Sequence, residues 1–159
     1  MSKLVSVILL FCFFFSCVGV SKKRLAEIDE SIRDVAVDIY KPLFSDALIF
    51  DVTSDGDFTN EDLMKCLYIS ASELKHKSFD KIYLSRKGEK IYYIDGNYFG
   101  QFGRDLQPTE DKREFISRIP ENTYKLDGIH AFPSSQAGWV LVESQRMEYV
   151  DDLLNELRK

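Results

Sequence analysis

The sequence predicts one α+β domain, with a small and mainly antiparallel sheet and helices packed on one face of it. The first supporting observation is a hairpin pattern at about residues 79–95, where β-branched and aromatic residues flank a short polar stretch. The second is an amphipathic pattern towards each end of the chain, with apolar residues three and four positions apart. A hairpin joins consecutive strands, so it argues against a doubly wound parallel sheet.

The first expected element of the domain is an N-terminal amphipathic helix over residues 26–40. Its apolar face consists of Leu25, Ile28, Ile32, Val35 and Ile39. Pro42 ends this helix or bends it, because a proline in a helix interior removes a hydrogen bond and clashes with the preceding turn. The apolar run at 47–52 is expected to form a strand, and the polar residues 53–57 a turn.

A second helix is expected from Thr59 to about Lys77. Thr59 is a favoured N-cap residue, and Glu61 and Asp62 place negative charge in the first turn, where the helix dipole favours it. The apolar face of this helix consists of Leu63, Cys66, Leu67, Ala71 and Leu74.

The central hairpin is expected to pair residues 81–85 with residues 90–94 across a turn that contains Gly88. The next segment, 98–103, alternates aromatic residues with glycine, and we expect a short helix or turn that packs its aromatic side chains on the sheet.

The C-terminal third gives a weaker pattern. Residues 114–119 are expected to form a strand, although a short helix beginning at Thr109 fits the same residues. Residues 122–136 are expected to be mostly loop, and 139–142 a last strand. A C-terminal amphipathic helix follows, with an apolar face of Met147, Val150, Leu153, Leu154 and Leu157.

The N-terminus carries a targeting pattern. Lys3 precedes an unbroken apolar run from Leu4 to Phe15, which is typical of an export signal. We therefore divide the chain into a targeting segment at 1–19 and one globular domain at 20–159, and expect export to the periplasm or the cell exterior.

Three interpretations of this segment remain open. A cleaved signal peptide would end after Gly19, where small residues suit the peptidase, and we slightly prefer this interpretation. A lipoprotein would instead be acylated at Cys17, and an uncleaved membrane anchor would use residues 4–20, a short span for a bilayer. The basic residues 22–24 resist export, because positive flanks prefer the cytoplasmic side.

Composition limits the function further. The chain has 21 basic and 26 acidic residues, so it has no general electrostatic reason to bind nucleic acid. Cys12 and Cys17 lie in the targeting segment, which leaves Cys66 as the one cysteine of the domain and excludes an internal disulfide. We expect Cys66 to be a small buried residue rather than a nucleophile.

Residues 51–62 resemble the calcium-binding loop of an EF-hand over twelve positions. The oxygen-bearing side chains at the ligand positions are those of Asp51, Thr53, Asp55, Thr59 and Asp62, and Gly56 occupies the glycine position. Two departures are an aspartate in place of glutamate at the last position and a β-like segment before the loop. The alternative is an Asp/Gly-rich turn that leads into a capped helix.

The hairpin tyrosines also have two interpretations. In the first interpretation, Tyr83 and either Tyr92 or Tyr93 share an exposed face and form a recognition patch. In the other, which we favour, they pack under the helices or under the 98–102 segment.

No catalytic, cofactor-binding or metal-binding residue is assigned from the sequence. The two histidines, His76 and His130, have no cysteine or acid at metal-ligand spacing, and no nucleophile signature is present. We therefore expect a non-catalytic protein without a cofactor that binds another protein or an envelope component. A membrane tether through the N-terminal segment is compatible with this expectation. A calcium-binding module using 51–62 and a lipoprotein acylated at Cys17 are the alternatives.

Overall fold

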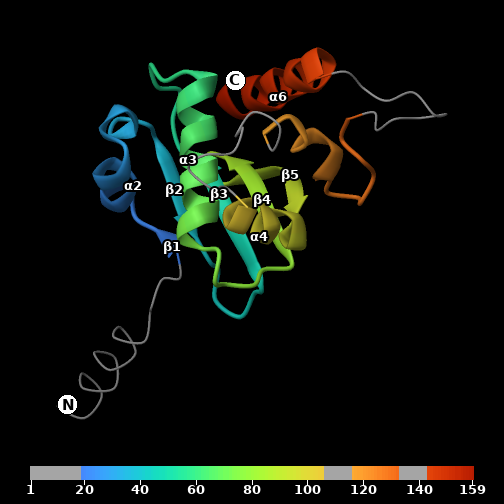
Figure 1. Cartoon of the computed structure of the whole chain (residues 1–159), viewed down its shortest axis with the longest axis horizontal. Helices are drawn as coiled ribbons and strands as arrows, with labels where there is room; N and C mark the ends of the chain where they lie inside the picture. Colours follow the sequence, from blue (N-terminus) through green and yellow to red (C-terminus); the bar gives the residue numbers. More distant parts are fainter. Residues whose placement is uncertain (1–18, 106–115, 133–142) are drawn as a thin grey trace, which may run out of the picture.

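The structure is a computed structural model that describes residues 19–105, 116–132 and 143–159. Its centre is a six-stranded sheet in which the spatial order of the strands is their order in the sequence (Figure 1). The strands are β1 (Gly19–Val20), β2 (Val37–Tyr40), β3 (Ala47–Val52), β4 (Lys81–Arg86), β5 (Glu89–Asp95) and β6 (Thr123–Lys125). Neighbouring strands are antiparallel except β3 and β4, which are parallel. This confirms the predicted α+β fold with a mainly antiparallel sheet.

Helices cover one face of this sheet. They are α2 (Lys22–Ile28), α3 (Asn60–Glu73), α4 (Gly96–Asp105) and α6 (Glu143–Arg158), with short 3₁₀ helices η1 (Glu30–Ile32) and η2 (Pro120–Asn122). Helix α3 is the crossover that joins the parallel strands β3 and β4, and α2, α4 and α6 each contact it (Figure 1). The described helices therefore form one layer, which we call the covered face of the sheet; the opposite face is the open face.

The core lies between α3 and the central strands. Leu48, Phe50 and Val52 of β3 and Ile82 and Leu84 of β4 are almost completely buried there. Close approach of α4 to α3 requires glycine at position 103, because a Cβ atom at that position would lie 2.1 Å from the carbonyl oxygen of Ala71. Phe99 and Phe102 of α4 are buried in the same core, so the predicted packing of the 98–102 aromatic residues is confirmed.

The predicted N-terminal helix over 26–40 is wrong beyond its first three residues. Helix α2 begins earlier, at Lys22, and ends at Ile28. The C-cap residue Asp29 has an extended backbone, and its carboxylate accepts a hydrogen bond from the Ser31 amide. Val35, Val37 and Ile39 are buried along a strand-forming segment. Val35 and Ile39 are four residues apart, a spacing that fits a helix and a strand equally. The helical interpretation therefore mistook a strand pattern, which repeats every two residues, for a helical pattern, which repeats every 3.6 residues.

The second helix and the hairpin are confirmed. Thr59 caps α3, and its side chain and that of Asp62 form a reciprocal capping box. The hairpin turns through Lys87 and Gly88, whose φ angles of 51° and 82° are those of a tight turn between antiparallel strands. Lys87 thus adopts a left-handed conformation that the polar stretch alone did not reveal.

The C-terminal third differs more from the prediction. The strand predicted at 114–119 is not found in the described part of that segment. Residues 116–117 are helical there, which agrees with the alternative of a short helix. Strand β6 was missed inside the expected loop, because three residues carry too little pattern. The strand expected at 139–142 lies outside the described residues, as does the segment 1–18. Helix α6 is confirmed, with Val150, Leu153, Leu154 and Leu157 buried. None of the described helices combines the length and apolar character needed to cross a bilayer.

Candidate functional site

Tyrosine side chains lie in register across the open face of the sheet. Strand pairing places Tyr40 beside Ile49, Ile49 beside Tyr83, Tyr83 beside Tyr93, and Tyr93 beside Tyr124. An isolated bridge then pairs Tyr124 with His130. We call Tyr40, Tyr83, Tyr93, Tyr124 and His130 the tyrosine row. It crosses the sheet from β2 to the segment that follows β6.

Four rings of this row, from Tyr83 to His130, contact one another in series. The centroids of Tyr83 and Tyr93 are 6.1 Å apart in an edge-to-face arrangement, and those of Tyr93 and Tyr124 are 5.2 Å apart and stacked. The imidazole of His130 lies 4.4 Å from the Tyr124 ring. Such pairs contribute about 0.5–1.5 kcal/mol each beyond their area burial. These four rings thus support one another, without a helix above them in the described structure. Tyr40 is separated from Tyr83 by Ile49 of β3.

Two lysines flank the row. The Lys81 ammonium lies 4.2 Å from the Tyr93 ring centroid, and the Lys90 ammonium lies 3.8 Å from that of Tyr83. Both distances are within the range of cation–π attraction. The surface therefore combines aromatic rings with the positive charges of Lys81 and Lys90.

A β-bulge decides which hairpin residues reach the open face. The register between β4 and β5 shifts at Leu84 and Ser85, so that Lys90 pairs with Ser85 while Tyr92 pairs with Leu84. Tyr92 therefore packs against the core, where its hydroxyl hydrogen-bonds to the Glu156 carboxylate. Burial and this carboxylate raise the pKa of Tyr92 to about 12.

The two interpretations of the hairpin tyrosines each hold for part of the set. Tyr92 and Tyr98 pack against the core, as the favoured interpretation expected. Tyr83 and Tyr93 instead share the open face, as the recognition-patch interpretation expected. Tyr40 and Tyr124 were not assigned to this surface from the sequence, because strands β2 and β6 were not predicted there.

Exposed aliphatic residues extend the surface beyond β6. Leu126 and Ile129 are both exposed in the turn after that strand. The turn approaches the row, since a Cβ atom on Gly128 would lie 3.8 Å from the Tyr93 hydroxyl. An apolar contact area thus continues from the row into this turn.

The oxygen atoms of the calcium-like loop are engaged elsewhere. The Asp51 carboxylate is buried and accepts hydrogen bonds from the Gly88 amide at 3.0 and 3.1 Å. Asp55 pairs with Arg86 at 2.8 Å and with Lys87 at 2.6 Å, and hydrogen bonding from Lys87 is the main cause that lowers its pKa. These two acids thus fix the β4–β5 turn to the end of β3.

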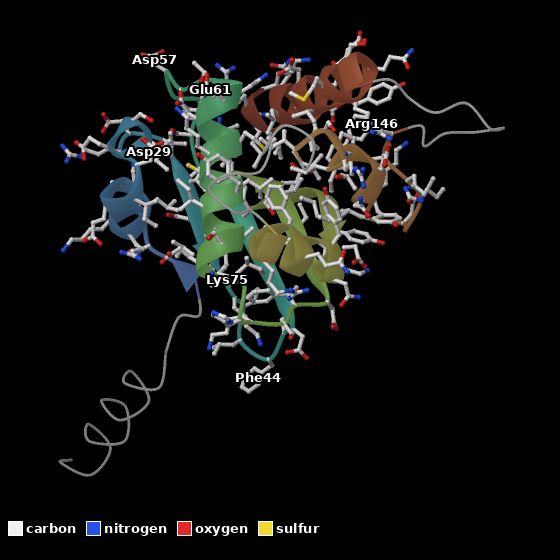
Figure 2. The ribbon with its side chains drawn as sticks, in the orientation of Figure 1. Asp29, Phe44, Asp57, Glu61, Lys75 and Arg146 are labelled. Atoms are coloured by element: carbon white, nitrogen blue, oxygen red, sulfur yellow. The ribbon has the colours of Figure 1, made fainter. Side chains whose placement is uncertain are left out.

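The end of the loop has a structural role as well. The Asp62 carboxylate accepts hydrogen bonds from the Thr59 amide and hydroxyl, both at 2.8 Å, and the amide bond is the main cause that lowers its pKa. Asp57 and Glu61 lie nearby at the edge of the molecule (Figure 2). Within the described residues, no three acidic, histidine or cysteine side chains are grouped so that they could hold a metal ion. The geometry is that of the alternative interpretation, a turn leading into a capped helix.

The candidate nucleophiles are poorly placed for chemistry. Cys66 is buried in α3 as expected, and burial raises the pKa of its thiol to about 12. Ser85 is completely buried between Asp51 and Lys90 in strand register, where no substrate reaches its hydroxyl. His76 and His130 are both exposed, and they lie in separate turns.

Comparison with models of known protein families, with curated protein sequences and with solved structures found no match to this chain. The tyrosine row is therefore interpreted from its own chemistry.

Proposed function

We propose that this chain is an exported, envelope-attached domain that binds a protein partner through the tyrosine row and performs no catalysis. The observation that supports the proposal is the row itself, an ordered aromatic surface on a sheet face that the described helices leave open. Tyrosine is enriched at protein interfaces because its ring offers a large apolar area and its hydroxyl a polar contact.

The dimensions of the surface suit a partner of protein size. The row runs over the strands from β2 to β6, and four strand spacings of about 4.8 Å give a length of roughly 19 Å. The exposed Leu126 and Ile129 lengthen it at the β6 end. The ring-to-ring contacts hold the side chains before binding, which lowers the entropy cost of association.

The attachment to the envelope is argued from β1. Gly19 pairs with Tyr40, and a Cβ atom at this position would lie 2.1 Å from the carbonyl oxygen of Ile39. Cleavage after Gly19 would remove one of the two residues of β1. Acylation at Cys17 keeps the strand complete, so we now favour the lipoprotein interpretation over the cleaved signal peptide. Mass spectrometry of the processed N-terminus tests this choice, and a mature chain that begins at Val20 would contradict it.

The binding proposal is tested by photo-crosslinking of the full-length chain in its own cells. A benzoylphenylalanine at position 124 is expected to give one discrete crosslinked product with a protein. A second substitution, Tyr93→Ala, is expected to reduce that product about tenfold, the size of effect expected for an interface anchor.

The matched control is the same crosslinker at position 149. Tyr149 is also half-buried but belongs to α6, where it packs on Phe132 and against the core of the covered face. Equal products from positions 124 and 149, or a product that Tyr93→Ala leaves unchanged, would contradict binding through the row.

A further inference from the structure

One end of the sheet carries an exposed apolar tip. The turn between β2 and β3 contains Leu43, with 60% of its surface exposed, and Phe44, with 105%. Figure 2 shows Phe44 projecting from the molecule at this end. Phe44 thus has essentially no packing partner in the described structure, which is unusual for a large aromatic residue in water.

The backbone at this tip is held in an uncommon conformation. Phe44 has a φ of 58°, in the left-handed region that a bulky side chain rarely adopts. Residues in sparsely populated backbone conformations cost about 1–3 kcal/mol each and cluster at functional sites. Two contacts lie within the turn: an ion pair between Lys41 and Asp46 at 3.1 Å, and a hydrogen bond that the Ser45 amide donates to the Pro42 carbonyl oxygen at 3.4 Å.

Basic residues stand beside the tip. The turn after α3 adjoins it through a hydrogen bond that the Asp80 amide donates to the Asp46 carbonyl oxygen at 2.8 Å. This second turn exposes Lys75, which is labelled in Figure 2, and Lys77. Neither lysine forms an ion pair within the described residues. Asp46, which pairs with Lys41, and Asp80 are exposed at the same end, so the positive charge there comes from Lys75 and Lys77 of the neighbouring turn. Exposed apolar side chains with lysines nearby are an arrangement by which proteins enter the interface of an anionic bilayer.

The chain enters the domain at this same end. Gly19 lies opposite Tyr40, immediately before the turn that carries the tip. Cys17 precedes Gly19 by two residues, a distance of at most about 7 Å. A lipid attached at Cys17 would therefore bring this end of the sheet against the membrane surface.

We propose that Leu43 and Phe44 insert into the anionic lipid surface to which the chain is attached, with Lys75 and Lys77 on the headgroups. A bilayer fits the tip better than a protein does, because the tip is a narrow projection beside the attachment point and not a flat or hollow face. The proposal rests on the attachment proposed above and is independent of the partner on the tyrosine row.

The test places a fluorophore at the tip. The processed protein carrying Phe44→Trp is purified from membranes and reconstituted into vesicles of phosphatidylethanolamine and phosphatidylglycerol, with and without brominated acyl chains. Subtracting the wild-type signal removes the contribution of Trp139, the single native tryptophan. The tip tryptophan is expected to lose about half of its emission in brominated vesicles, since interfacial side chains reach the acyl boundary. Leu43→Trp provides a second probe of the same tip.

Ile129→Trp is the matched control, because Ile129 is about as exposed as Leu43 (63% and 60%) but lies beside the tyrosine row. It is expected to keep its emission. Unquenched tryptophan at both 43 and 44 in a protein that floats with the vesicles would overturn tip insertion alone. A protein that does not float with vesicles would contradict the attachment as well.

The lysines are tested by charge reversal. Lys75→Glu combined with Lys77→Glu is expected to reduce the quenching of Phe44→Trp, whereas Lys125→Glu combined with Lys159→Glu makes the same charge change elsewhere and is expected to leave it intact. Equal quenching in vesicles of phosphatidylcholine alone would overturn the anionic part of the proposal.

Discussion

The two faces of the sheet bury their side chains by different means. On the covered face, Leu48, Ile82 and Leu84 lie beneath helices that come from distant parts of the sequence. On the open face, Tyr83, Tyr93 and Tyr124 are half-buried mainly by one another. The covered face therefore ties the whole domain together, whereas the open face can change its side chains at a smaller cost in stability. This difference leaves the open face free to specialise in binding.

The strongest test of this comparison is Leu84→Ala on the covered face. We expect the free energy of unfolding to fall by about 2–5 kcal/mol, because the change removes buried methyl groups and leaves a cavity. Urea denaturation of the purified protein measures it. Ile129→Ala, at an exposed position, is the control and is expected to stay within about 0.5 kcal/mol of the wild type. Similar losses for both variants would mean that the helical layer does not hold the fold.

The contact between α3 and α4 gives the next largest effect. Gly103→Ala is expected to destabilise the protein by about 1–3 kcal/mol, since the new methyl group would collide with the backbone of Ala71. Gly100→Ala in the same helix meets only the Arg104 side chain at 3.4 Å. It is expected to be neutral or to stabilise by up to about 1 kcal/mol, because alanine is the better helix former. Thermal melting of the two variants compares them, and equal melting temperatures would contradict the close packing.

A double-mutant cycle on Tyr93 and Tyr124 measures how far the open face supports itself. Each single change to alanine removes the stacked pair, and the coupling energy between the two positions is expected to be about 0.5–1.5 kcal/mol. Urea denaturation of the four proteins gives this value. A coupling near zero would show that the tyrosines are aligned by the strands alone.

The smallest effect concerns the start of α3. Hydrogen bonds from Thr59 lower the pKa of Asp62 in the folded protein. The stability that this carboxylate contributes is therefore complete above its unfolded pKa of about 3.9 and is lost as the pH falls through the lower folded value. The free energy of unfolding of the wild type is expected to decrease below about pH 4. In Asp62→Asn this decrease is expected to be smaller, by less than about 1 kcal/mol, because the side chain is exposed. Denaturation between pH 2.5 and pH 6 measures it, and Asp57→Asn serves as the control.

Sequence patterns predicted the parts of the fold that are decided locally. The cap at Thr59, the two arms of the hairpin and the apolar face of α6 each depend on a few neighbouring residues, and each was confirmed. The strand β2 was mistaken for a helix because its burial depends on β1 and β3, which lie on either side of it in space.

The candidate site was harder to predict for a related reason. Whether Tyr92 or Tyr93 faces the open side depends on the bulge at Leu84 and Ser85, which shifts the alternation by one residue. Tyr124 joins the row only because β6 pairs with β5. Turns and helix caps use the same acidic residues as metal sites do, so the residue types at 51–62 alone do not distinguish a calcium loop from a capped turn.

The strand order has one more consequence. Every described strand after the first lies next to the one that precedes it in the chain. A polypeptide that folds from its N-terminus onward can therefore extend the sheet one strand at a time, with each new strand pairing at an existing edge. Contacts between near neighbours in sequence favour rapid folding.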